Sequence, residues 1–443
     1  MTMRKLGILL LCLVFVTLAA CTVQPPVSST ALPTSTSIPP TAAITAGPVP
    51  STTPTPSVTM DATAAITPSG PATCQVIPVV PTANPTAEVL MPSPSNIDWV
   101  NGSKTASITV TEYGDYQSTT SAQLYIMLNA LQKKYPDDIR LVFRHFPLSE
   151  QYDKDYLAAQ AAEAAGKQGK FWEFTGILYS NQNDWVNKST DDFTVWANMQ
   201  AVGLGLNPDQ FKNDMLADAT VTLIKNARAQ AMLLIQAGTL TNDPFLFFNS
   251  VAVYPPYSLD ILSSMVEYLK LPAKAFTSCP PMTVDPTKNY TATIHTEKGD
   301  IVIALYADKA PWAVNSFIYL AEQGWYNGSG FFRVIPGFLA QAGDPSNSGL
   351  GNPGYAFSDE FTPDLRFDKA GVVGMANNGQ AGTNGSQFFF TYTAAPSLDG
   401  KYTVFGQVMT GMNVLTTLRP RNPDSDIILL TPDPILSITI EVK

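Results

Sequence analysis

The sequence predicts a multidomain chain in which an α/β domain is followed by a mainly-β domain. Strand and helix patterns alternate along residues 98–270, whereas residues 290–443 are dominated by strand patterns and by loops rich in Gly, Pro, Asn and Ser. Residues 22–95 consist mostly of Thr, Ser, Pro and Ala without hydrophobic periodicity, so they cannot bury enough apolar surface to fold. A chain of 443 residues has room for two or three domains.

The N-terminus has the pattern of an export signal. Arg4 and Lys5 precede an apolar run over residues 6–16, and Leu-Ala-Ala-Cys follows at residues 18–21. This tetrapeptide resembles a bacterial lipobox, which implies cleavage before Cys21 and attachment of lipid to that cysteine. The alternative, a membrane span, needs roughly 20 apolar residues, and this run is shorter. We therefore expect a lipoprotein anchored on the outer side of a bacterial membrane.

These patterns divide the chain into five parts. We predict a lipoprotein signal peptide at residues 1–20, a disordered stalk at 21–96, an α/β domain at 97–272, a linker at 273–287 and a mainly-β domain at 288–443. As a flexible coil of about 75 residues, the stalk would span roughly 50 Å. It would lift the folded domains away from the membrane.

Charge and histidine content exclude two classes of function. The net charge is −10 and charged residues make up 14% of the chain, so we expect no nucleic-acid partner. His145 and His295 are the only histidines, which is too few for a histidine-based metal or charge-relay site. We expect neither a metal nor a cofactor.

The cysteines suggest one disulfide. Cys12 lies in the signal and Cys21 at the lipid site, which leaves Cys74 and Cys279 in the mature protein. Both lie in Pro-rich segments, one on each side of the α/β domain, and an exported protein enters an oxidising compartment. We predict that Cys74 and Cys279 pair; two unpaired thiols or intermolecular bridges are the alternatives.

The α/β domain is predicted from the order of its elements. Residues 107–113 alternate as a strand, and Ser118 can cap a helix whose inward face carries Leu124, Leu128 and Leu131. A strand at 139–148, an alanine-rich helical region at 152–181, a strand opened by Pro244 and a helix at 258–270 follow. This is the order of a thioredoxin fold with a helical insertion.

This domain contains three further informative segments, which are EYGDYQSTTSAQ at 112–123, RHFPL at 144–148 and DPFLFFNS at 243–250. They resemble segments of the DsbA-like thiol oxidoreductases. The resemblance places the two cysteines of the family's C-x-x-C motif on Ser118 and Ser121, and its cis-proline on Pro244. A hydroxyl cannot replace a thiolate in disulfide exchange, so we expect a domain without redox activity. It then either binds unfolded client chains or serves as a folded spacer.

The mainly-β domain is predicted to begin with a hairpin over residues 290–306. A helix then begins near Pro311, since proline is favoured in the first turn, with Val314, Phe317, Ile318 and Ala321 facing inward. An alternating strand at 436–442 closes the domain.

Two long motifs in this domain place one arginine among apolar rings and amide side chains. They are FFRVIPGFLAQAGDP at 331–345 and MANNGQAGTNGSQFFFT at 375–391, followed by SLDGKYTVFGQV at 397–408. Rings at such spacings are usually only core, but this does not explain a charge within FFRVIPGF together with Gln341 and Asn377. The motifs resemble the cyclophilin family of peptidyl-prolyl cis-trans isomerases, which implies a closed β-barrel with flanking helices.

The resemblance also implies a non-covalent isomerase. Rotation about an X-Pro bond must break amide resonance over a barrier of roughly 18–20 kcal/mol, and a donor aimed at the prolyl nitrogen in the transition state lowers it. Arg333 matches the family's donor, and Gln341 and Asn377 match positions that hold the peptide backbone. The positions that match its substrate-binding residues are Phe338, Leu339, Ala376, Gln387, Phe389, Leu398 and Tyr402.

The chain departs from the family at three positions. Phe332 replaces a histidine, Ser397 a tryptophan and Tyr402 a second histidine. Because Arg333 and the apolar pocket are intact, we expect turnover to survive. We predict an isomerase that assists the folding of exported proteins by acting on their proline-containing segments. The alternative is a cell-surface chaperone or peptide-binding protein with weak or no isomerase activity.

Overall fold

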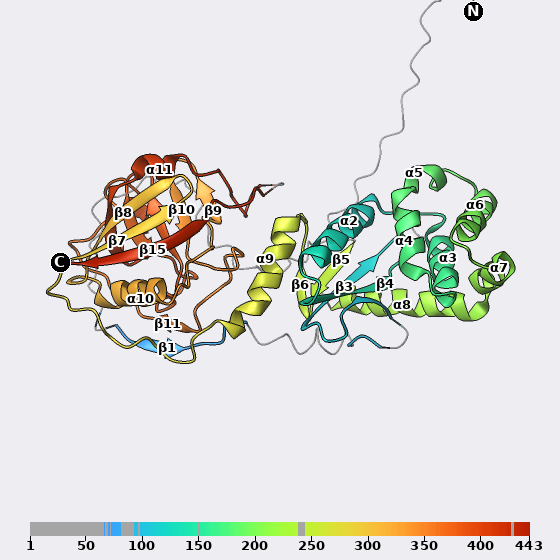
Figure 1. Ribbon diagram of the computed structural model, residues 1–443, viewed down its shortest axis with the longest axis horizontal. Helices are drawn as coiled ribbons and strands as arrows, with labels where there is room; N and C mark the ends of the chain where they lie inside the picture. The colour runs from blue at the N-terminus through green and yellow to red at the C-terminus, as the bar shows by residue number, and fades with distance from the viewer. Residues whose placement is uncertain are drawn as a thin grey trace, which may run out of the picture. The chain divides into compact units, whose positions relative to one another are not determined.

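The computed structural model describes residues 66, 70, 72–80, 93–95, 98–148, 151–237, 244–426 and 429–443 (Figure 1). The predicted signal peptide, Cys21 and most of the predicted stalk lie outside these residues and stay predictions. Within the described ranges an α/β domain precedes a mainly-β domain, as the sequence predicts. No helix in the described part of the chain is long and apolar enough to span a membrane.

The α/β domain is built on a five-stranded sheet. Its strands lie in the order β2, β4, β3, β5, β6; β3 and β4 are parallel, and the other neighbours are antiparallel. Their bounds are Trp99–Gly102 (β2), Ile108–Gly114 (β3), Ile139–His145 (β4), Phe245–Phe248 (β5) and Val251–Val253 (β6). Helices α2 (Thr119–Lys134) and α9 (Leu259–Lys270) share an apolar cluster with β3, β4 and β5, and α8 (Asp218–Gln236) belongs to a second cluster with β3 and β5.

Local sequence explains where α2 begins. The Ser121 N–H donates a hydrogen bond to Ser118 Oγ at 3.2 Å, so Ser118 is the N-cap. Leu124, Leu128 and Leu131 recur on one face and are buried in the sheet-facing cluster. The predicted cap and the three inward leucines are confirmed.

Among the residues that the structure describes between β4 and β5, six helices form the helical insertion. Besides α8 they are α3 (Asp155–Lys167), α4 (Phe171–Ser180), α5 (Gln182–Trp185), α6 (Thr190–Gly203) and α7 (Pro208–Leu216). Helix α3 packs closely because its buried residues are mostly alanines and include Gly166, where an added Cβ would overlap with Trp99 Cζ2. The Trp99 ring stacks on Phe171 with centroids 4.5 Å apart, which ties the edge strand β2 to the insertion.

The mainly-β domain contains an eight-stranded antiparallel sheet in the order β15, β7, β8, β14, β12, β13, β10, β9. The strands are β7 (Tyr290–Thr296), β8 (Gly299–Leu305), β9 (Arg333–Ile335), β10 (Leu339–Ala342), β12 (Val372–Met375), β13 (Phe388–Thr391), β14 (Val404–Thr410) and β15 (Ile435–Val442). Helix α10 (Pro311–Glu322) packs on this sheet, and α11 (Met412–Thr416) follows β14.

The prediction of a closed barrel is wrong, because the sheet curls without closing. The end strands β9 and β15 form no ladder with each other. The segments next to them are joined by an isolated bridge between Gly330 and Pro434 and by the Gly328 N–H, which donates to Ile435 O at 2.8 Å. The outer edge of β9 is taken by a loop instead: the Val334 N–H donates to Arg421 O at 2.6 Å, and the Arg421 N–H returns a bond to Val334 O at 2.9 Å. Because the outer edge of the three-residue strand β9 already pairs with this loop, it is not available to pair with β15.

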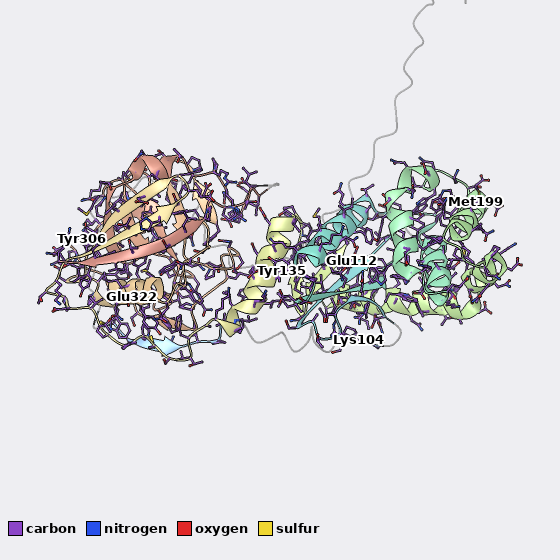
Figure 2. The ribbon with its side chains drawn as sticks, in the orientation of Figure 1. Lys104, Glu112, Tyr135, Met199, Tyr306 and Glu322 are labelled. Carbon is purple, nitrogen blue, oxygen red and sulfur yellow. A yellow bond between two sulfur atoms is a disulfide. The ribbon has the colours of Figure 1, made fainter. Side chains whose placement is uncertain are left out.

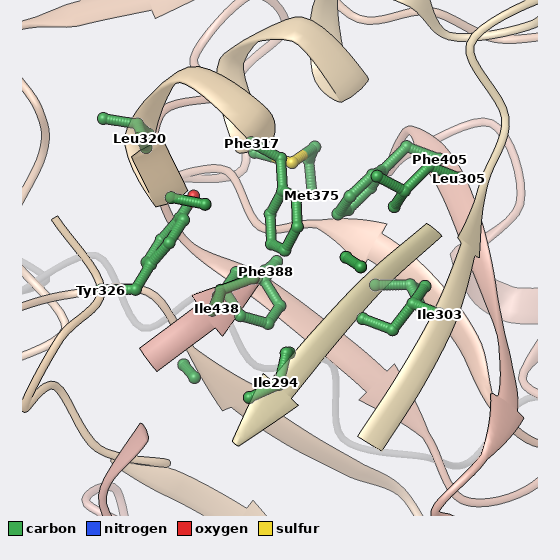
Figure 3. Packing of buried hydrophobic residues seen from close by; sticks show 14 of the residues in the cluster. Ile294, Ile303, Leu305, Phe317, Leu320, Tyr326, Met375, Phe388, Phe405 and Ile438 are labelled. Carbon is green, nitrogen blue, oxygen red and sulfur yellow. The ribbon is translucent and has the colours of Figure 1, made fainter. Parts of the chain in front are cut away.

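The core of this domain lies between the sheet and α10. Val314, Phe317, Ile318 and Ala321 are buried, as the sequence predicts for the inward face of the helix. The Phe317 ring contacts two sheet residues, Phe388 and Phe405, with centroid distances of 5.2 and 5.4 Å (Figure 3). This packing fixes the strands that carry the site described below.

A short N-terminal segment also belongs to the mainly-β domain. Strand β1 (Cys74–Val76) pairs with β11 (Tyr355–Phe357), and a disulfide joins Cys74 to Cys279, the pair that the sequence predicts. We call residues 73–80 the strap. They lie within residues 21–96, for which the sequence predicts disorder. The strap departs from that prediction because its backbone finds a partner strand and its cysteine a covalent partner.

Candidate active site

The site is organised by three side-by-side residues on neighbouring strands. Arg333 on β9 lies opposite Gln341 on β10, and Gln341 lies opposite Phe389 on β13. Directly paired residues project from the same face of a sheet. Strand register therefore gathers a cation, an amide and an aromatic ring that lie up to 56 positions apart in the sequence.

Arg333 is held at one nitrogen and unpartnered at another. Its Nη2 donates to Asp424 Oδ2 at 3.0 Å, and its side chain is 15% exposed. Its Nε has no hydrogen-bond partner among the residues described. Asp424 is half exposed and lies in the loop whose Arg421 pairs with β9. It belongs to none of the sequence motifs, so the sequence did not predict this contact. The pair limits the motion of the guanidinium and leaves the Nε–H donor unused.

An apolar pocket adjoins this row. Phe389 stacks on Phe367 with centroids 5.5 Å apart, and the Tyr402 ring meets Phe389 edge-on at 5.5 Å. The same apolar cluster contains the other four apolar residues that the sequence predicts for the site, Phe338, Leu339, Ala376 and Leu398, and further neighbours such as Val404. All the aromatic and aliphatic positions expected to bind substrate thus lie together.

Sequence reasoning missed two parts of this pocket. Phe367 is fully buried beneath Phe389, and no motif pointed to it. Gly374 lies opposite Phe389 across β12 and β13, and a Cβ there would lie 2.8 Å from Cζ of both Phe367 and Phe389. A glycine inside a strand marks such close approach, so Gly374 was the available signal.

An amide network forms the neighbouring groove. Gln341 Nε2 donates to Gln387 Oε1 at 2.9 Å, and Gln387 Nε2 donates to the carbonyls of Gly349 and Gly351 at 3.0 and 2.9 Å. Asn377 Nδ2 donates to the carbonyl of Lys401 at 2.9 Å. Gln341, Asn377 and Gln387 line a groove of about 440 Å³. The predicted amide residues are therefore also gathered at one place.

The three departures from the family pattern lie in different environments. Phe332 is buried, and its carbonyl accepts a hydrogen bond from Arg421 Nη1. Burial raises the pKa of Tyr402, and the positive charge of Arg333 opposes that rise, which puts the phenol within the field of the guanidinium. Ser397 is exposed and lies beside the buried Leu398 in the chain.

Ser118 and Ser121, the positions at which the sequence predicts the C-x-x-C cysteines to be replaced, are buried in the α/β domain. Ser118 and Ser121 are 3% and 0% exposed, and the Asp115 N–H donates to Ser121 Oγ at 3.3 Å. Burial raises the pKa of Asp115 to about 6. Glu112 is buried on β3, the strand that leads to this turn (Figure 2). The peptide bond before Pro244 involves a residue outside the described ranges, so its predicted cis form stays a prediction.

Among the described residues, no group of three or more His, Cys, Asp or Glu side chains is placed to hold a metal ion.

Comparison with known proteins identifies both domains. Residues 291–440 match the family model described as "Cyclophilin type peptidyl-prolyl cis-trans isomerase/CLD", and residues 95–236 match the model described as "Thioredoxin". "Peptidyl-prolyl cis-trans isomerase A" of Mycobacterium tuberculosis is 44% identical over 146 residues, which cover 30% of this chain and 80% of that protein. "Peptidyl-prolyl cis-trans isomerase-like 3" of Gallus gallus is 47% identical over 129 residues, 28% of this chain and 80% of that protein.

A solved structure is also similar. The crystal structure of a cyclophilin type peptidyl-prolyl cis-trans isomerase of Cryptosporidium parvum is 33% identical and covers 34% of this chain and 98% of its own, with a TM-score of 0.32.

Proposed function

Because the chain belongs to the cyclophilin-type peptidyl-prolyl cis-trans isomerase family through its C-terminal domain, we propose that it catalyses X-Pro isomerisation in exported proteins on the outer side of a bacterial membrane. The observation that carries this proposal is the row of Arg333, Gln341 and Phe389 beside an apolar pocket. It combines a charged donor with a surface that fits a proline ring.

The chemistry follows from what changes during rotation. As the X-Pro bond twists, amide resonance is lost and the prolyl nitrogen becomes a better hydrogen-bond acceptor. Arg333 donates to that nitrogen most strongly in the twisted state, and this difference is what lowers the barrier. Phe389, Leu339 and Leu398 hold the proline ring, and Gln341 holds the peptide beside it. No bond forms or breaks, and no proton is transferred.

Turnover of a proline-containing tetrapeptide tests the proposal. We expect the purified chain to exchange the cis and trans NMR signals of the X-Pro bond far faster than the uncatalysed exchange, which takes tens to hundreds of seconds. The coupling of a trans-specific protease to the same peptide gives an independent rate. A chain that binds the peptide without accelerating exchange would instead be the cell-surface peptide-binding protein of the alternative.

The membrane anchor is a separate part of the proposal and needs its own test. It rests on the residues before position 22, where Leu-Ala-Ala-Cys follows a basic and apolar start. In bacterial cells we expect the chain to incorporate a labelled fatty acid and to sediment with membranes, and Cys21→Ala to lose the label. Cys12→Ala is the matched control and should keep it. A label that survives in Cys21→Ala would rule out this anchor site.

A further inference from the structure

The strap supplies two residues to the groove beside the active-site row. Gln75 and Ile77 line the same groove as Gln341, Asn377 and Gln387, although they lie more than 200 positions earlier in the chain. Ala356, the partner of Gln75 in β11, lines it too. The groove is therefore completed by a segment that precedes the α/β domain.

The strap is fastened along its whole length. The Ser358 N–H donates to Thr73 O at 2.9 Å, the Ile77 N–H donates to Gly354 O at 3.0 Å, and Asn352 Nδ2 donates to Val79 O at 3.2 Å. Between Thr73 and Ile77, the strap is also held by the ladder from β1 to β11 and by the disulfide from Cys74 to Cys279. A segment with so many attachments can hold side chains in a fixed place.

Strand alternation decides which strap residues face the groove. Side chains of successive residues point to opposite sides of a strand, so Gln75 and Ile77 share one side and Val76 points to the other. Val76 does not line the groove and is 56% exposed. It therefore offers a matched control within the same strand.

The groove is continuous with the proposed catalytic row. Gln341 lies opposite Arg333 and also lines the groove, while Ala376 belongs both to the apolar pocket and to the groove. A peptide whose proline fills the pocket would thus place a nearby side chain in the groove. The described residues that line the groove carry no charge, and several bear amides. Burying an ion there would cost its hydration without a countercharge, whereas a polar neutral side chain can bond to the amides.

We propose that Gln75 and Ile77 determine specificity by forming the wall of a subsite for an uncharged polar side chain near the proline. The proposal rests on the proposed function, since it assumes that the pocket takes proline. The disulfide adds the one covalent attachment to the three ladder pairs and the hydrogen bonds that hold the strap. Loss of the disulfide then weakens discrimination between peptides.

Peptides that differ at one position test the proposal with the full chain. In each set of peptides, one residue within two positions of the X-Pro bond, on either side, is Asn, Asp or Lys, and the rest of the peptide is the same. We expect the wild-type chain to prefer Asn at one of these positions. Gln75→Glu should shift the ratio of kcat/KM for Lys over Asp by about fivefold toward Lys, as one partly exposed ion pair does. Val76→Glu is the control for the added charge and should shift that ratio less.

Two further variants separate the roles of the wall and of the disulfide. Ile77→Ala should raise KM for the Asn peptide more than it changes kcat, and Cys74→Ser with Cys279→Ser should flatten the preference among the three peptides. The proposal is overturned if Gln75→Glu and Val76→Glu give the same ratios. If the wild-type chain accelerates no peptide, the proposed function fails; the affinities of the same peptides, measured by NMR titration, then still decide whether Gln75 selects among them.

Discussion

Arg333→Ala is expected to lower kcat/KM for X-Pro isomerisation by about 10²–10³-fold, which is the loss typical of removing one donor that acts in a transition state. The fold should persist. The side chain makes an ion pair with the half-exposed Asp424, and such pairs contribute little to stability. The strand bonds of β9 involve the backbone and remain. Catalysis by peptide NMR and folding by circular dichroism would be measured on the same sample.

Arg333→Lys separates charge from geometry. Lysine keeps the positive charge but replaces the planar set of donors with a single flexible ammonium group. We expect it to recover only a small part of the lost rate. Arg419→Ala is the matched control: Arg419 pairs with Asp433 at 2.9 Å, and Lys298 still pairs with that carboxylate at 2.8 Å after the change. Full activity in Arg333→Ala would remove this residue from the mechanism.

Glu360→Gln is expected to make the unfolding free energy of the chain less dependent on pH, because Glu360 has different pKa values in the folded and unfolded states. Glu360 Oε1 accepts from the Trp312 N–H at 3.1 Å and Oε2 from the Ala313 N–H at 2.9 Å, in the first turn of α10. Burial raises the pKa of Glu360 to about 7, and these two hydrogen bonds oppose the rise only in part. Helix α10 covers the core, so this carboxyl couples pH to the whole domain.

The sign follows from proton linkage. The folded state holds the proton on Glu360 up to about pH 7, whereas the unfolded chain releases it near its ordinary pKa of 4.5. The folded state binds more protons in this window, so the contribution of Glu360 is complete below pH 4.5 and is lost as the pH rises through 7. The loss amounts to about 3 kcal/mol at most.

Urea denaturation at pH 5 and pH 8 measures this effect. Wild-type chain should lose more unfolding free energy between the two values than Glu360→Gln does. Asp115, whose pKa is raised to about 6, acts in the same direction but is present in both proteins, so the difference isolates Glu360. Glu322→Gln, an exposed change at the end of the same helix, should behave as wild type. Equal pH dependence in wild type and Glu360→Gln would contradict the prediction.

Much of the site could be predicted because its residues lie in contiguous motifs. Arg333, Phe338, Leu339 and Gln341 fall within one run of fifteen letters, and their spacing matches a strand, a turn and a strand. Asp424 could not be found in this way. It reaches Arg333 from a loop 91 positions later, and an isolated aspartate in a polar loop has no pattern that marks it.

Phe367 and the strap escaped prediction for a similar reason. Phe367 enters the pocket only because Gly374 leaves room for its ring against Phe389. The strap looked like the rest of a Thr- and Pro-rich stretch, since three residues are too few to show a strand period. Its order depends on partners in β11 and at Cys279, which are far away in the sequence.

The sequence by itself determined the two domains, their order and most of the side chains that meet at the candidate active site. These features depend on local periodicity and on long motifs, and both occupy contiguous stretches of the sequence. Only the tertiary structure decided that the sheet stays open, that Asp424 holds Arg333 and that the strap completes the groove. Each of these features is a contact between groups that lie far apart in the sequence, so it exists only in the folded chain.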